Sequence, residues 1–182
     1  MSLRHLVLAS AALAAITSAP LAAKNPRVGG AAMYSTKNIV AYAVNSKDHT
    51  TLVAAVKAAG LVDTLSSKGP FTVFAPTNAA FARLPAGTVE TLVKPESKPA
   101  LTNILTYHVV PGRITAGQIA RLAARNRGTA TLKTVQGDTL RFHKSGSGWA
   151  VMDSKGGMAK ITIANVMKSN GVIHVIDHVL MP

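Results

Sequence analysis

The sequence predicts an α+β fold whose helices come mainly from the first half of the chain and whose strands come mainly from the second half. Apolar residues recur at helical spacing from residue 37 to residue 124. Short β-prone runs separated by glycine-containing turns fill residues 130 to 179. Because the two kinds of element are segregated along the chain, alternating strand–helix–strand units are not indicated.

The first 23 residues have the pattern of a secretory signal peptide. Arg4 and His5 precede an apolar run over residues 6–19, and small residues follow as far as Ala23. The run has about 14 residues, which is short for a membrane span. We therefore expect cleavage after Ala23, a secreted or periplasmic protein, and no transmembrane segment in the mature chain. The glycine-rich, basic residues 24–36 are expected to form a flexible or loosely docked arm, and residues 37–182 one domain.

Helical spacing begins at Lys37, and Asp48 is the expected cap of a second helix that ends near Gly60. A short helical turn follows over 61–65. The run 71–74 is β-prone and must end near Pro76, because proline cannot donate to a strand ladder. Thr77 is a suitable N-cap for a helix over 78–84.

The next part of the chain alternates between short helices and turns before the strands take over. Helices are predicted over 89–93, 100–106 and 115–124, and a strand is predicted over 107–110. The remaining strands are predicted over 130–135, 139–143, 149–153, 160–164 and 172–179. Leu140 and Phe142 alternate with polar residues, which indicates one buried and one solvated face. Asn170 and Gly171 are a predicted tight turn, since both residues tolerate positive φ.

Three segments resemble the signature blocks of the fasciclin (FAS1) family. They are residues 69–78 (GPFTVFAPTN), 107–112 (YHVVPG) and 169–177 (SNGVIHVID), in the family's order. The resemblance extends over residues 37–182 and implies a β-sandwich or wedge with helices packed at one end. It also implies non-catalytic cell adhesion or matrix interaction. Where members often carry an Asp-Ile pair this chain has Asn165-Val166, which weakens the transfer of a receptor-binding motif known in animal relatives.

Two groups of residues are candidate binding sites. Tyr107 and His108 form either a recognition patch or part of the core, with His108 holding a neighbouring loop. Arg121, Arg125 and Arg127 lie in a stretch with seven basic residues and one acidic residue, in a chain of formal net charge +13. This stretch predicts either a face for anionic polysaccharide and other cell-surface or matrix components, or a solvated basic surface. No specific nucleic-acid partner is expected.

The residue inventory gives no support for catalysis, and neither a cofactor nor a metal is expected. Cysteine is absent, acidic residues number seven, and no G-x-S-x-G elbow occurs. His174 and His178 fall on a predicted strand and would be about 13 Å apart, too far to share one ion. The alternative function is a carrier of a carotenoid-like pigment or lipid between the N-terminal helices and the sheet. Methionines would line its pocket, unless they fill the core.

Overall fold

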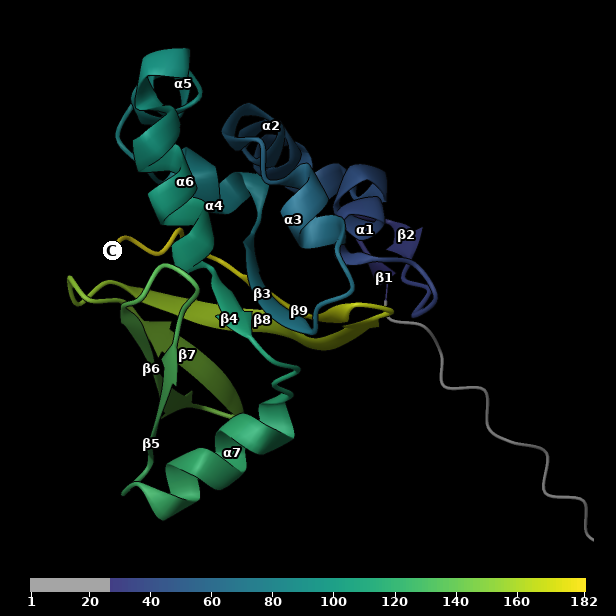
Figure 1. The fold of residues 1–182 in the computed structure, drawn as a ribbon. Helices are drawn as coiled ribbons and strands as arrows, with labels where there is room; N and C mark the ends of the chain where they lie inside the picture. Colours follow the sequence, from purple (N-terminus) through teal and green to yellow (C-terminus); the bar gives the residue numbers. More distant parts are fainter. Residues whose placement is uncertain (1–26) are drawn as a thin grey trace, which may run out of the picture.

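A computed structural model describes residues 27–182, and the predicted signal peptide (1–23) lies outside the described residues (Figure 1). The predicted α+β architecture is confirmed. The helices are α1 (Ile39–Asn45), α2 (Thr50–Ala59), α3 (Val62–Ser66), α4 (Asn78–Ala82), α5 (Thr88–Leu92), α6 (Lys98–Tyr107) and α7 (Ala116–Arg125), with 3₁₀ turns η1 (Lys47–His49) and η2 (Pro95–Ser97). The strands are β1 (Arg27–Val28), β2 (Ala31–Ala32), β3 (Phe71–Pro76), β4 (Val109–Pro111), β5 (Thr129–Lys133), β6 (Thr139–Ser145), β7 (Gly148–Met152), β8 (Met158–Lys168) and β9 (Gly171–Ile176).

Seven of the strands form one sheet in the order β4-β3-β9-β8-β7-β6-β5. Strands β3 and β9 run parallel, and the other neighbours are antiparallel. The sheet curls until its two ends meet, because the amide of Val135, just after β5, donates to the carbonyl oxygen of Val109 in β4 at 2.7 Å. Helices α1 to α6 lie on one side of the β3–β9 pair, and α7 lies on the other side beside β5 (Figure 1).

The parallel pair β3–β9 is buried on both faces and separates two apolar cores. Val73 and Ile173 face the first core, which contains α1, α2 and part of α6. Phe74 and Ile176 face the second core, which α7 and the antiparallel strands complete. All six residues of β9 are buried, as expected for a parallel strand covered on two sides.

Two predicted helix ends are confirmed. The hydroxyl of Thr77 accepts the amide of Ala80 at 3.2 Å, and Gly60 ends α2 in the left-handed conformation at φ 71°. Asp48, in contrast, does not cap α2. It lies in the 3₁₀ turn η1, and His49 takes the N-cap position.

The predicted strand over 107–110 is wrong in its first half. Tyr107 is the last residue of α6, and the amide of His108 donates to the carbonyl oxygen of Leu105 at 3.1 Å. Only Val109–Pro111 pairs with β3. The helix ends one residue later than predicted because the side chain of Tyr107 is fully buried in the second core from this helical position.

Part of the segment expected to be a flexible or loosely docked arm packs on the domain. Residues 27–32 form a two-stranded hairpin, β1 with β2. Val28 and Met33 are each 3% exposed and belong to the first core. Burial of these two side chains holds the hairpin beside α1.

The turn between β8 and β9 fixes the helical layer to the sheet through one side chain. The Asn170 amide nitrogen donates to the carbonyl oxygens of Leu65 at 2.8 Å and Ser67 at 2.9 Å, and its oxygen accepts the amide of Ile39 at 3.0 Å. Asn170 is 5% exposed. These bonds join α1 and the end of α3 to the start of β9.

Neither Asn170 nor Gly171 has positive φ, so the predicted reason for this pair was wrong. Gly171 is required for close approach instead. A Cβ at this position would collide with the backbone of Phe71 in the neighbouring strand β3.

We predict that Asn170→Ala lowers the free energy of unfolding by about 3 kcal/mol, because two buried backbone groups and one partly buried backbone group lose their partner. Urea denaturation followed by circular dichroism measures this. Ser169→Ala, at the exposed neighbouring position, is the control and should change stability little. Equal stability of the two variants would contradict the structural role of Asn170.

Candidate functional site

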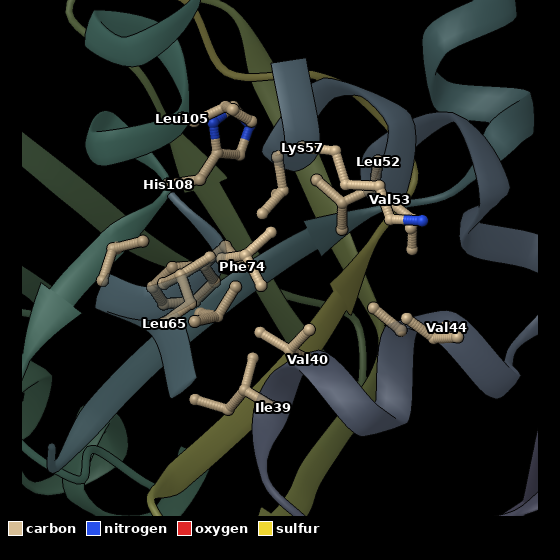
Figure 2. A pocket seen from close by; sticks show the side chains of 15 residues that line it. Ile39, Val40, Val44, Leu52, Val53, Lys57, Leu65, Phe74, Leu105 and His108 are labelled. Carbon is tan, nitrogen blue, oxygen red and sulfur yellow. The ribbon is translucent and has the colours of Figure 1, made fainter. Parts of the chain in front are cut away.

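An apolar cavity of about 190 Å³ lies between the first three helices and the sheet (Figure 2). Its lining residues are almost all aliphatic and come from α1, α2, α3, β3, β4 and the end of α6: Ile39, Val40, Ala43, Val44, Leu52, Val53, Val56, Lys57, Val62, Leu65, Val73, Phe74, Leu105, His108 and Val109. Residues 39, 40, 43 and 44 lie on one face of helix α1, as their helical spacing in the sequence indicates, and together they form one wall of the cavity.

The cavity communicates with the surface between α1 and α2. Val44 is 57% exposed, and Lys57 is an exposed residue in the same lining. Apart from Lys57 and His108, every lining side chain is a hydrocarbon. A chamber of this kind binds apolar groups by excluding water. Its volume suits a ring or a short acyl segment, since an apolar cavity of about 150 Å³ accepts benzene.

Tyr107 and His108 are both buried, at 0% and 2% exposure, as the core alternative expects. The Tyr107 hydroxyl donates to the carbonyl oxygen of Thr139 at 3.2 Å and accepts the amide of Ser154 at 2.9 Å. It thereby ties α6 to the strands of the second core.

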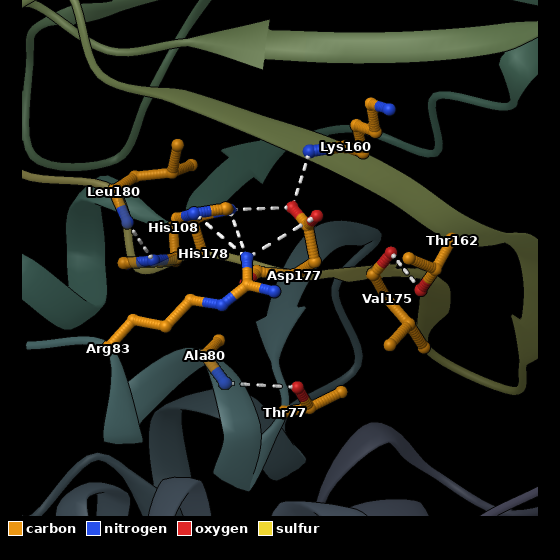
Figure 3. A network of polar contacts seen from close by, with 10 residues as sticks. All are labelled: Thr77, Ala80, Arg83, His108, Lys160, Thr162, Val175, Asp177, His178 and Leu180. Carbon is orange, nitrogen blue, oxygen red and sulfur yellow. Dashed lines mark hydrogen bonds and ion pairs between the residues drawn. The ribbon is translucent and has the colours of Figure 1, made fainter.

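His108 connects α6 to the C-terminal segment, as Figure 3 shows for its bond to Leu180. Its Nδ1 donates to the carbonyl oxygen of Ile104 at 2.8 Å, and its Nε2 accepts the amide of Leu180 at 3.0 Å. The amide of Leu180 therefore requires the neutral ring with its proton on Nδ1. Burial lowers the pKa of His108 from 6.5 to about 4, although the bond to Ile104 and the charge of Asp153 act in the opposite direction. The same ring borders the apolar cavity.

The structure brings two of the three predicted arginines together. Arg121 and Arg125 are exposed on α7, while Ile119 and Ala123 of the same helix are buried in the second core. The two arginines border a shallow groove of about 320 Å³ with Ile114, Gln118 and Leu122. Arg127 lies beyond the helix end at φ 53° and does not line the groove.

A polar network at the C-terminal end of β9 had no counterpart in the sequence predictions (Figure 3). An oxygen of Asp177 lies 2.9 Å from Nδ1 of His178, and the other lies 3.7 Å from Arg83. Burial raises the pKa of Asp177, but the hydrogen bonds from His178 and from the amide of Lys160, with the charge of Arg83, bring it below its usual value. Arg83 is remote in the sequence, so no local pattern could reveal this contact.

Within residues 27–182, no group of three or more histidine, aspartate and glutamate side chains is arranged to hold a metal ion. No helix in this range is both long enough and apolar enough to cross a membrane.

Comparisons with known proteins agree with the architecture. Residues 47–182 match the family model of the fasciclin domain. "Protein sll1483" of Synechocystis sp. is 50% identical over 161 residues, covering 87% of this chain and 81% of that protein. The "Cell surface glycolipoprotein MPB83" of Mycobacterium bovis is 36% identical over 170 residues, covering 90% and 70%. The FAS1 domain pair of the insect cell adhesion molecule Fasciclin I superposes with a TM-score of 0.71 at 17% identity, over 80% of this chain and 51% of that one.

We predict that acid destabilises the fold through His108. In the unfolded chain this histidine titrates near 6.5, whereas in the folded chain its pKa is about 4. Between these values only the unfolded state binds the proton, so the stabilisation present above pH 6.5 is lost as the pH falls towards 4, by about 3 kcal/mol. Urea denaturation across this range measures the loss.

In His108→Gln the dependence of stability on pH should be shallower by up to about 1.4 kcal/mol per pH unit, because one titrating group has been removed. The test compares the change in stability per pH unit in the two proteins, so a uniform loss of stability in the variant does not affect it. Two results would contradict the role of His108 in acid destabilisation. One is the same dependence of stability on pH in the two proteins, and the other is an NMR titration that places the pKa of folded His108 near 6.5.

Proposed function

This chain belongs to the fasciclin domain family, and from that membership we propose that it is a non-catalytic interaction module outside the cytoplasm, where it adheres to anionic polysaccharide of a cell surface or matrix. One solved structure with this fold is that of a cell adhesion molecule, and one sequence relative is a cell surface glycolipoprotein. The structural observation that carries the proposal is the exposed arginine pair on α7.

The geometry of α7 favours a linear polyanion. Arg121 and Arg125 are one helical turn apart, about 6 Å along the axis, and therefore point the same way. Their like charges repel each other, and a bound polyanion relieves this repulsion while its counterions are released. The groove beside them offers Ile114 and Leu122 as apolar floor for a sugar ring.

We predict that the triple variant Arg121→Glu, Arg125→Glu and Arg127→Glu binds an acidic polysaccharide at least about tenfold more weakly, since each exposed pairing contributes up to about 1 kcal/mol. Binding to immobilised alginate at low and at physiological salt measures this, and wild-type binding should weaken with salt.

The matched control reverses three exposed lysines elsewhere on the surface, Lys68, Lys94 and Lys155. It changes net charge equally. If the two triple variants lose the same affinity for the polysaccharide, the overall positive charge of the protein determines binding, and a specific role of the α7 arginines is contradicted.

The apolar cavity favours a second candidate function, the carriage of a hydrophobic small molecule. Support comes from its position between α1, α2, α3 and β3, and from its hydrocarbon lining. A volume of about 190 Å³ encloses one end of a long pigment or lipid, and the opening beside Val44 and Lys57 gives the remainder a path to the surface.

We predict that Ala43→Phe, which fills the cavity from α1, abolishes co-purification of an apolar ligand with the protein secreted from a native type of host. Organic extraction with mass spectrometry measures the bound ligand. Ala54→Phe, at an exposed position of α2, is the control and should leave the ligand content unchanged. A wild-type protein without any apolar ligand would contradict the carrier function.

A further inference from the structure

A second pocket lies on the opposite face of α1. It has a volume of about 300 Å³ and is bordered by the end of the N-terminal hairpin, by α1 and by the last residue of β8. Its lining residues are Ala32, Met33, Tyr34, Lys37, Ala41, Tyr42, Asn45 and Lys168. Two of them are lysines, and none is acidic. This pocket is separate from the apolar cavity and from the arginines of α7.

Lys168 is the unusual member of this set, because it is 2% exposed. Its ammonium group donates to the carbonyl oxygen of Tyr34 at 3.0 Å and lies 5.1 Å from the centre of the Tyr42 ring. An ammonium has three N–H donors, so one hydrogen bond leaves two of them unused. No carboxylate within residues 27–182 forms an ion pair with it.

A buried cation without an anion is costly, because it has lost water and gained only a carbonyl dipole and a ring face. Accordingly, burial lowers the pKa of Lys168. Lys37 lines the same pocket from an exposed position and adds to the positive potential. The pocket therefore has the charge, the unused donors and the space that an oxyanion requires.

We propose that this pocket binds one oxyanion, a carboxylate or a sulfate, with Lys168 as the principal donor and Lys37 at the rim. The anion is either free in solution or carried on a sugar. Tyr34 distinguishes these sources, because it is 53% exposed at the edge of the pocket, where its ring can pack on the face of a sugar. This site does not depend on the α7 surface.

The test is a titration of the ¹⁵N-labelled protein with sodium sulfate, sodium glucuronate and neutral glucose at constant ionic strength. We expect amide shifts at Ala41, Tyr42 and Lys168 that saturate with both anions and stay absent with glucose. Shifts that rise linearly without saturation, or that occur only on α7, would overturn the proposal.

Variants assign the donor and identify the source of the anion. Lys168→Met keeps the approximate length of the side chain and removes its charge. This variant should bind both anions about tenfold or more weakly. Lys133→Met, at an exposed position of β5, is the control and should leave the affinity for both anions unchanged. Should Lys168→Met not fold, Lys37→Met gives the same comparison with a smaller expected loss. Unchanged affinity in the folded variant would refute the site.

Tyr34→Ala separates the two sources of the oxyanion. A loss of glucuronate affinity with unchanged sulfate affinity shows a sugar acid as the ligand, whereas unchanged affinity for both shows a free anion. The outcome for this pocket is independent of the outcome for the arginines of α7, because the variants used in the two experiments share no residue.

Discussion

The side chain of Asn170 is the contact on which the rest of the structure depends. Its amide joins three backbone groups that lie more than 100 residues away in sequence, at the start of α1 and the end of α3. The carbonyl oxygen of the same residue accepts the amide of Phe71, which begins β3. One buried residue therefore sets the distance between the helical layer and the parallel strands. That distance defines the apolar cavity on one face of α1, and Lys168, two residues before Asn170, lies in the pocket on the other face.

The parallel strands β3 and β9 have a second consequence, because they keep the two cores apart. The apolar cavity belongs to the first core, and α7 is anchored by Ile119 and Ala123 to the second. A ligand in the cavity and a polyanion on α7 consequently contact different layers of the molecule. The two candidate functions can be separated by mutation for this reason, and one protein can have both.

Local chemistry allowed much of the fold to be predicted from the sequence. Thr77 and Gly60 act at helix ends through their own backbone and hydroxyl groups, and the alternation of Leu140 and Phe142 marks the buried face of β6 without knowledge of its neighbours. The predictions that failed share a cause, which is that residues distant in the sequence determine the local conformation. Tyr107 remains helical because its side chain is buried against distant strands of the second core, and Gly171 is needed because Phe71 of another strand is close. A lysine at the end of a strand gives no sign of burial, so the Lys168 pocket could not be predicted.

The positive charge of the protein acts in two physically different ways. Arg121 and Arg125 remain hydrated on α7, so their charge costs little to maintain and acts over a distance that salt shortens. Lys168 has lost its hydration, so its charge is costly until a bound anion replaces the interactions with water that burial removed. Hydrated charge attracts a broad class of polyanions, whereas a desolvated cation discriminates by fit, since only a group small enough to reach its free donors compensates it. The α7 face is therefore suited to adhesion, and the pocket beside α1 to the recognition of a single chemical group.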